Sequence, residues 1–213
     1  MNRILLSNIE LYDGEVVSVG SDGRYAHLPQ KQGTLDGACA TYSVMMALLI
    51  LGTISEEDML LGEQYTSKSS KKLFRIFCED HGMHRNGQTF FKINKMLKEG
   101  FASEVITKHR LMFGKDAAYE IAFSIDKDIP VVASIAFKGT DMGHAFLVVG
   151  YEEENGVVHK LLCLDPSGVE PKGRKRWNAE ISIYRKQKYF DHILYGFEAQ
   201  KVELQDFITI KRR

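Results

Sequence analysis

The chain has 213 residues, of which 44% are hydrophobic and 26% are charged, and its 28 Lys and Arg balance its 28 Asp and Glu. This length suits one domain with a substantial core, and the composition is ordinary for a globular protein. Balanced charge provides no broad field that would attract nucleic acid or an anionic membrane. The composition therefore argues against a nucleic-acid-binding protein, and it leaves the oligomeric state open.

The N-terminal residues show no sustained apolar run and no small-residue cleavage site, so no signal peptide is expected. The longest apolar run, Val44–Leu51, is too short to span a bilayer. Cys39, Cys78 and Cys163 are too few, and odd in number, for a disulfide framework. We expect a reducing, cytoplasmic setting, although secretion without a signal would leave no mark of this kind.

Apolar spacing in the first half of the chain predicts mainly helices. One or two short strands are expected within residues 1–19. Residues 39–51 form a helix that is apolar nearly all round, which is typical of a buried helix, and Gly52 ends it. Further helices are predicted from helical spacing and from start and stop signals, over residues 55–58, 70–81, 89–99 and 116–125.

The second half reads as strands, at residues 129–137, 144–151, 157–164, 179–184, 192–197 and 202–210. The first three are apolar on both faces and are therefore expected at the centre of a covered sheet. Helices followed by strands indicate an α+β fold. We expect one domain over residues 1–213, with a helical lobe at about 30–126 and an antiparallel sheet lobe at about 127–213, joined by residues 1–29.

Cys39 stands where a Gly-rich turn meets the predicted buried helix, in the stretch QKQGTLDGACATYS. A sulfur there would lie against unpaired N–H groups and the positive end of the helix dipole, which favours the nucleophilic thiolate. The Cys39 N–H and the side-chain amide of Gln32 are candidate donors to an oxyanion, with Gln30 as a competitor for the second role. The alternative is that Cys39 is a small core residue, since free cysteine is often buried.

His144 is the candidate base, because it opens a predicted strand directly after a glycine-containing loop. The pair Asn155–Gly156 predicts a two-residue hairpin turn. Pairing outward from that turn puts Phe146 opposite Asp165, so Asp165 lies diagonal to His144 on the same face. Asp165 could then orient the imidazole, unless the register slips by one residue. The alternatives are a hydrogen-bonded strand histidine and a turn aspartate before proline.

At this point the segments resemble a known family. QGTLDGACATYS resembles the active-site segment of papain-type cysteine peptidases, with Gln32 and Cys39 at matching positions, and HAFLVVGY is similar to their histidine strand. Papain-type enzymes have asparagine at the third position, whereas this chain has LDPSG with Asp165. A histidine strand followed by Asp-Pro resembles the double-glycine leader peptidase domains of bacterial ABC exporters and their stand-alone relatives. Their usual Asp-Cys pair is absent here, since Ala38 precedes Cys39.

The resemblance implies a papain-like fold, with a central helix carrying Cys39 and an antiparallel sheet carrying His144 and Asp165. It implies a cysteine peptidase that acts on a peptide or protein substrate through an acyl-thioester and needs no metal or organic cofactor. Cys39 would be the nucleophile, His144 the base, Asp165 the orienting carboxylate and Gln32 an oxyanion donor. Two alternatives remain, namely acyl transfer or deamidation on the same fold, and a papain-like module that only binds a partner.

Two other patterns have simpler interpretations. The spacing Cys78-x-x-His81-x-x-His84 superficially suggests a metal cluster, but no fourth ligand has suitable spacing. We therefore expect the end of a surface helix there. Basic clusters at residues 172–176 and 211–213 are expected to be a solvated loop and a solvated terminus, with docking to an acidic partner as the alternative.

Overall fold

The structure, a computed structural model, describes residues 1–20, 23–28, 30–31, 38–59, 67–73, 75, 88–171, 173, 175–184 and 187–213. Its helices are α1 (Cys39–Ile50), α2 (Glu56–Met59), α3 (Lys68–Leu73), α4 (Phe90–Gly100) and α5 (Gly114–Ile125). Its strands are β1 (Asn2–Leu5), β2 (Ile9–Tyr12), β3 (Glu15–Val19), β4 (Tyr25–Leu28), β5 (Val105–Arg110), β6 (Val131–Phe137), β7 (Gly143–Glu154), β8 (Val157–Leu164), β9 (Ala179–Ser182), β10 (Phe190–Leu194) and β11 (Gln200–Arg212). The described helices all lie within residues 39–125, but strands precede them as well as follow them, so the predicted order of helices first and strands after holds only in part.

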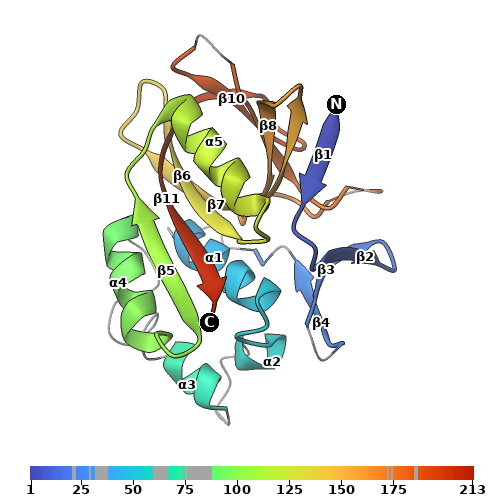
Figure 1. Cartoon of the computed structure of the whole chain (residues 1–213), viewed down its shortest axis with the longest axis vertical. Helices are drawn as coiled ribbons and strands as arrows, with labels where there is room; N and C mark the ends of the chain where they lie inside the picture. Colours follow the sequence, from blue (N-terminus) through green and yellow to red (C-terminus); the bar gives the residue numbers. More distant parts are fainter. Residues whose placement is uncertain are drawn as a thin grey trace.

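The larger sheet of the described residues has eight antiparallel strands (Figure 1). From β6 to β11 each strand pairs with the next one in the chain, and β11 pairs back with β6, so these strands close into a ring. Strand β1 adds to β7, and β5 adds to β11. Closure of the sheet was not part of the sequence prediction, because it depends on the pairing of β11 with β6, far apart in the chain.

The N-terminal region differs from the expectation of one or two strands. Residues 1–19 contain three strands, and β2, β3 and β4 form a separate three-stranded sheet. Asp13 and Gly14 have φ values of 51° and 84° at the turn between β2 and β3. An Asp-Gly pair favours this two-residue turn, so the signal for this hairpin was present in the sequence.

Strand β5 is a second difference, since it lies within the half of the chain that was predicted as helical. Its residues alternate between buried Val105 and Thr107 and exposed Ile106 and Lys108. This period of two is typical of a half-buried strand. Pairing with β11 carries the strand into the larger sheet.

The predicted helix over residues 39–51 corresponds to α1, which begins at Cys39. Ten of its residues are buried on all sides of the helix, because it packs against β6 and β7 on one side and against β3, β4 and α4 on others. The helices predicted at 89–99 and 116–125 correspond to α4 and α5. Of the helix predicted at 70–81, α3 covers the start, and residues 76–87 lie outside the described part.

The predicted hairpin between β7 and β8 is confirmed. Asn155 and Gly156 have φ values of 52° and 73°, as a two-residue turn of this type requires. Glu154 pairs with Val157 at the turn, and Leu147 pairs with Leu164 at the far end, both as predicted. Two register shifts lie between these points and cancel each other.

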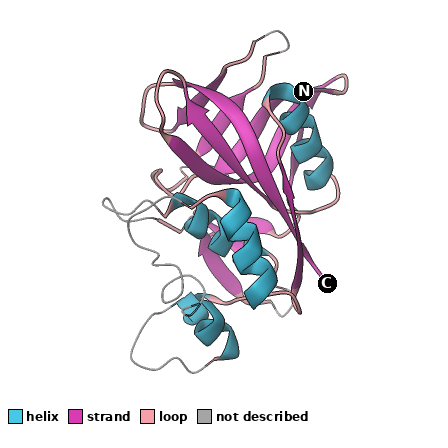
Figure 2. Ribbon diagram, turned by 90° about the vertical axis from the view of Figure 1, so that its left-hand side faces the viewer, coloured by secondary structure: helices cyan, strands magenta, loops and turns pink. Residues whose placement is uncertain are grey.

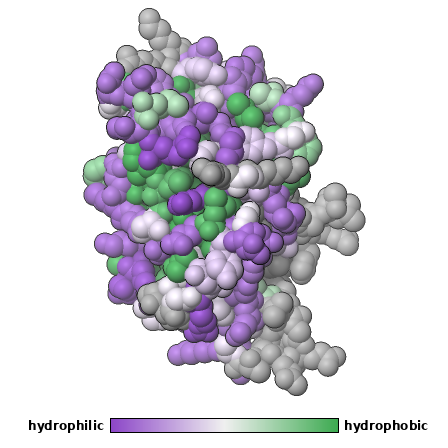
Figure 3. Space-filling model, turned by 90° about the vertical axis from the view of Figure 1, so that its right-hand side faces the viewer, coloured by the Kyte–Doolittle hydropathy of each residue, from purple (hydrophilic) through white to green (hydrophobic). Residues whose placement is uncertain are grey.

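Viewed from the side of α4, the larger sheet lies above most of the helices, and α5 stands beside the sheet at the same height (Figure 2). The opposite side, in Figure 3, is mainly hydrophilic, with hydrophobic side chains gathered in one area. Within the described residues, no helix combines the length and apolar character needed to cross a membrane.

Candidate active site

Cys39 is the first residue of α1, and its side chain is partly exposed. No side chain caps the helix at Ala38, and the first turn contains no acidic residue. The N–H groups at the helix start and the positive end of the dipole therefore favour a negative charge on the sulfur. The local sequence explains this position, since the apolar run that begins after Cys39 must be buried along the whole helix.

His144 lies near the start of β7, and its Nε2 donates a hydrogen bond to Asp165 Oδ1 at 2.8 Å. The His144 side chain is 11% exposed and that of Asp165 is 0% exposed. The Cys39 side chain lies close enough to His144 to contribute to the pKa of its imidazole. Since Nε2 is occupied by Asp165, Nδ1 is the ring nitrogen left for the sulfur. The structure thus brings together three of the predicted site residues, while Gln32 lies outside the described residues.

The electrostatics of this group favour charged forms. Burial would lower the pKa of His144, but the hydrogen bond with Asp165, the proximity of Cys39 and the negative charges of both groups raise it to about 10. Burial likewise opposes ionisation of Asp165, yet hydrogen bonds from His144 and Ser167, together with the nearby imidazole of His192, hold its pKa well below the usual range. At neutral pH the group therefore contains an imidazolium between a carboxylate and the sulfur.

Ser167 adds two donors to the same carboxylate oxygen. Its N–H and its hydroxyl donate to Asp165 Oδ1 at 2.9 and 2.6 Å, and the hydroxyl oxygen lies 3.2 Å from His144 Nε2. Sequence reasoning did not assign it this role. A serine two residues after an aspartate, at a turn, is a recognisable signal for such a contact, because the aspartate side chain can bond the backbone two residues on.

Asn178 supports Asp165 from the other side and was also missed. Its side chain is fully buried, and its Oδ1 accepts a hydrogen bond from the Asp165 N–H at 2.7 Å. Its Nδ2 donates to the carbonyls of Asp165 and Val169 at 2.9 and 3.0 Å. The backbone on both sides of the carboxylate is therefore held by one amide side chain. Nothing in the local sequence around Asn178 indicates this partnership.

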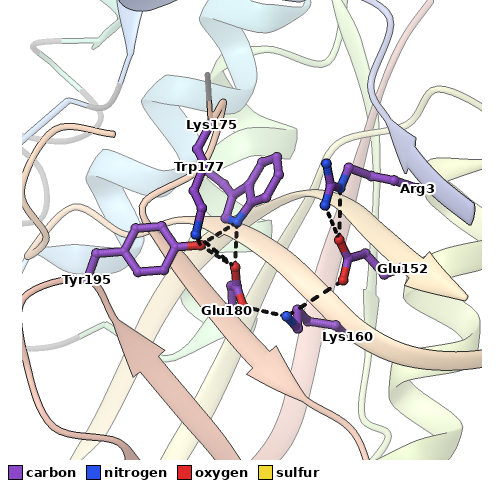
Figure 4. Close-up of polar contacts among 7 residues, drawn as sticks. All are labelled: Arg3, Glu152, Lys160, Lys175, Trp177, Glu180 and Tyr195. Carbon is purple, nitrogen blue, oxygen red and sulfur yellow. Dashed lines mark hydrogen bonds and ion pairs between the residues drawn. The ribbon is translucent and has the colours of Figure 1, made fainter. Parts of the chain in front are cut away.

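The segment that carries Asn178 is anchored by a polar network (Figure 4). Trp177 Nε1 donates to Glu180 Oε1 at 2.9 Å and to the Tyr195 hydroxyl at 2.8 Å. Tyr195 donates in turn to Glu180, and Lys160 forms an ion pair with Glu180 at 2.7 Å. Burial would raise the pKa of Glu180, but these contacts lower it to about 2. Trp177, the only tryptophan in the sequence, therefore helps to hold in place the segment that carries Asn178.

Aromatic rings surround the imidazole of His144. The ring centroids of Phe137, Phe146 and His192 lie 6.5, 6.4 and 6.3 Å from it. These rings exclude water from the pair that His144 forms with Asp165, which strengthens the interaction.

His192, for which the sequence suggested no partner, is 4% exposed and stacks on Phe146 with an interplanar angle of 15°. Its Nε2 lies 3.3 Å from Asp165 Oδ2, in poor alignment for a hydrogen bond. We regard the contact as electrostatic, because the carboxylate is charged and these two atoms face each other in a buried site. Asp165 thus has an imidazole beside each of its oxygens.

The described residues contain no group of three or more His, Cys, Asp or Glu side chains placed to hold a metal ion. Cys78, His81 and His84 lie outside the described residues.

Lys175 of the first basic cluster contributes to the network in Figure 4 and donates to the Tyr195 hydroxyl at 2.6 Å.

Comparison with known proteins gives one informative result. The Peptidase_C39 like family matches residues 24–191, which is most of the chain and includes Cys39, His144 and Asp165. A search of curated proteins finds no match to this chain.

Proposed function

Because this chain belongs to the Peptidase_C39 like family, we propose that it is a cysteine peptidase of papain-like fold that uses Cys39, His144 and Asp165. The observation that carries the proposal is the position of His144, which hydrogen bonds with Asp165 and has the Cys39 side chain close enough to affect the pKa of its imidazole. A thiolate at a helix N-terminus beside an imidazolium is an activated nucleophile. The packing of helix α1 against strands β6 and β7 supports the papain-like arrangement.

The reaction begins when the Cys39 thiolate attacks the carbonyl carbon of the substrate and a C–S bond forms. The negative charge on the carbonyl oxygen is stabilised by the Cys39 N–H at the start of α1 and, in this proposal, by the side chain of Gln32. His144 then gives its proton to the amine nitrogen, and the C–N bond breaks. Water, deprotonated by His144, attacks the thioester, and the C–S bond breaks to release the acid.

Asp165 has two functions in this sequence of steps. Its hydrogen bond with Nε2 orients the ring so that Nδ1 faces the sulfur, and its charge stabilises the imidazolium. Asn178 and Ser167 keep the carboxylate in place. The carboxylate therefore has little freedom to leave the imidazole.

Thiol labelling tests the nucleophile. We expect iodoacetamide to label Cys39 faster than Cys163, because Cys163 is fully buried and burial raises its pKa well above the ordinary value. Cys39→Ala is expected to abolish fast labelling and cleavage of a peptide library. Cys163→Ala, which also removes one thiol, is the matched control and should retain both.

Labelling of Cys39 no faster than that of the other cysteines would contradict the nucleophile assignment. Mass spectrometry of the products separates the remaining alternatives, since hydrolysis adds water and transfer adds an amine. Fast labelling of Cys39 with no product of either kind would favour a binding module.

A further inference from the structure

A pocket of about 160 Å³ opens beside His144. Ser167 and His192 also line it, and all three of these residues contact Asp165. None of the described residues that line the pocket belongs to α1. The pocket is therefore bounded by the imidazole and by residues around Asp165, with no described wall from the helix that carries Cys39.

The chemistry of acyl transfer indicates which part of a substrate lies at this pocket. In the peptidase reaction proposed above, His144 protonates the amine that leaves. The departing segment must therefore pass the imidazole, while the acyl segment stays bonded to the sulfur. A pocket walled by His144 thus receives the residue that follows the cleaved bond.

The walls of this pocket suit a side chain with an apolar stem. Phe137, Leu194 and Phe197 line the pocket, and Phe197 is 61% exposed. This volume equals that of about five water molecules, which is enough space for a single side chain. An aromatic wall also attracts a cation that approaches its face.

Among the described residues that line the pocket, two carry charge, namely the His144 imidazolium, which is paired with the buried Asp165 carboxylate, and the exposed Glu198 carboxylate. No ion pair of Glu198 occurs within the residues that the structure describes. Nearby lysines are engaged elsewhere, since Lys201 pairs with Asp191 at 2.8 Å and Lys188 pairs with Glu203 at 3.3 Å. Glu198 therefore presents a negative charge that these neighbours leave uncompensated.

We propose that this pocket binds the residue immediately after the cleaved bond and favours lysine or arginine there, an inference that rests on the proposed peptidase function. Long basic side chains combine an apolar stem with a charged tip. The stem would lie along Phe137 and Leu194, and the tip would reach Glu198 and the exposed face of Phe197. An acidic residue at the same position would be repelled by Glu198.

Profiling of new N-termini tests the inference with the full chain. A peptide library blocked at its N-termini is incubated with the protein, and the first residue of every new N-terminus is read by mass spectrometry. We expect enrichment of lysine and arginine and depletion of aspartate and glutamate. Glu198→Gln should lower the basic enrichment by about threefold, the scale of one partly exposed ion pair, and Glu198→Lys should make acidic residues the preferred class.

Glu203→Gln is the matched control, because it also removes one carboxylate from the C-terminal part of the chain but lies outside the pocket. It should keep the basic enrichment. Cleavage with the same first-residue distribution in wild type and Glu198→Lys would overturn the subsite while leaving the peptidase proposal standing. If the wild type yields no new N-termini at all, the peptidase proposal fails and takes the subsite with it, which is a different and recognisable result.

Discussion

Asp165 follows His144 by 21 positions in the chain, and its Oδ1 accepts a hydrogen bond from His144 Nε2 at 2.8 Å. The β7–β8 hairpin produces this contact, because its far end pairs Leu147 with Leu164 and so brings the following Asp165 beside Phe146 and diagonal to His144. The contact is buried, and it controls the protonation of the imidazole.

The first prediction concerns activity at high pH. The pKa of His144 is raised from 6.5 to about 10, so the protonated form persists from acid pH up to that value and is lost as the pH rises through it. Because His144 donates a proton to the leaving amine in the proposed reaction, kcat/KM should fall at alkaline pH with a midpoint near 10. Asp165→Asn should move this midpoint toward 6.5 and lower kcat/KM by at least about tenfold at neutral pH.

The control for this experiment is Asp206→Asn. His109 Nε2 lies 2.7 Å from Asp206 Oδ2, so the variant removes the carboxylate of a second His–Asp pair. Its pH profile should match that of the wild type. An alkaline midpoint that is the same in Asp165→Asn as in the wild type would show that Asp165 does not set the protonation of His144.

The second prediction concerns Asn178. Replacement by alanine leaves the buried Asp165 N–H and two carbonyls without their partner. The free energy of unfolding should fall by about 2–4 kcal/mol, as measured by urea denaturation. Asn8→Ala, which removes a 3.3 Å hydrogen bond to the Ile50 carbonyl and a 3.2 Å hydrogen bond from the exposed Ser7 hydroxyl, should cost less than about 1 kcal/mol. Equal losses in the two variants would argue against a special role of Asn178.

The third prediction separates position from packing at His192. His192→Phe keeps a ring that can stack on Phe146 but removes the nitrogen beside Asp165 Oδ2, and we expect kcat to fall by about tenfold, because the buried carboxylate loses a favourable electrostatic contact. His192→Gln supplies an amide N–H and should restore most of the activity. The reverse order, with His192→Phe the more active variant, would mean that His192 acts through packing alone.

The fourth prediction concerns the close approach of β1 to β7. A Cβ added at Gly150 would lie 2.5 Å from the Ile4 carbonyl oxygen and would also overlap the Leu5 side chain. Gly150→Ala should therefore displace β1 and lower the free energy of unfolding by about 1–3 kcal/mol. Gly143→Ala lies on the same strand, where the nearest atom is 3.5 Å away, and its midpoint in thermal unfolding should stay close to that of the wild type.

Local signals were sufficient for much of the fold. The start of α1 at Cys39, the Asn155–Gly156 turn, the end of β6 and both boundaries of β8 follow from apolar spacing and turn residues, which depend on neighbours in the chain. The positions of His144 and Asp165 on a shared face follow from the same turn by counting. The alternation within β5 was a local signal too, although the helical pattern around it obscured it.

Other features depend on residues that are distant in the chain. The ring closes only because β11 returns to β6, and β1 and β5 find their places only on strands that fold elsewhere. Asn178 and His192 reach Asp165 from later segments, and no nearby residue marks either one as its partner.

The sequence by itself determined which residues could carry the chemistry, because a thiol at a helix start and a histidine and an aspartate on one hairpin are arranged by short-range geometry. Only the tertiary structure decided how those residues are held and charged. The burial of Asp165, the contact with the His192 imidazole and the hydrogen bonds from Asn178 arise from packing between segments that are separate in the chain. The pKa of a group depends on all the atoms that surround it in space.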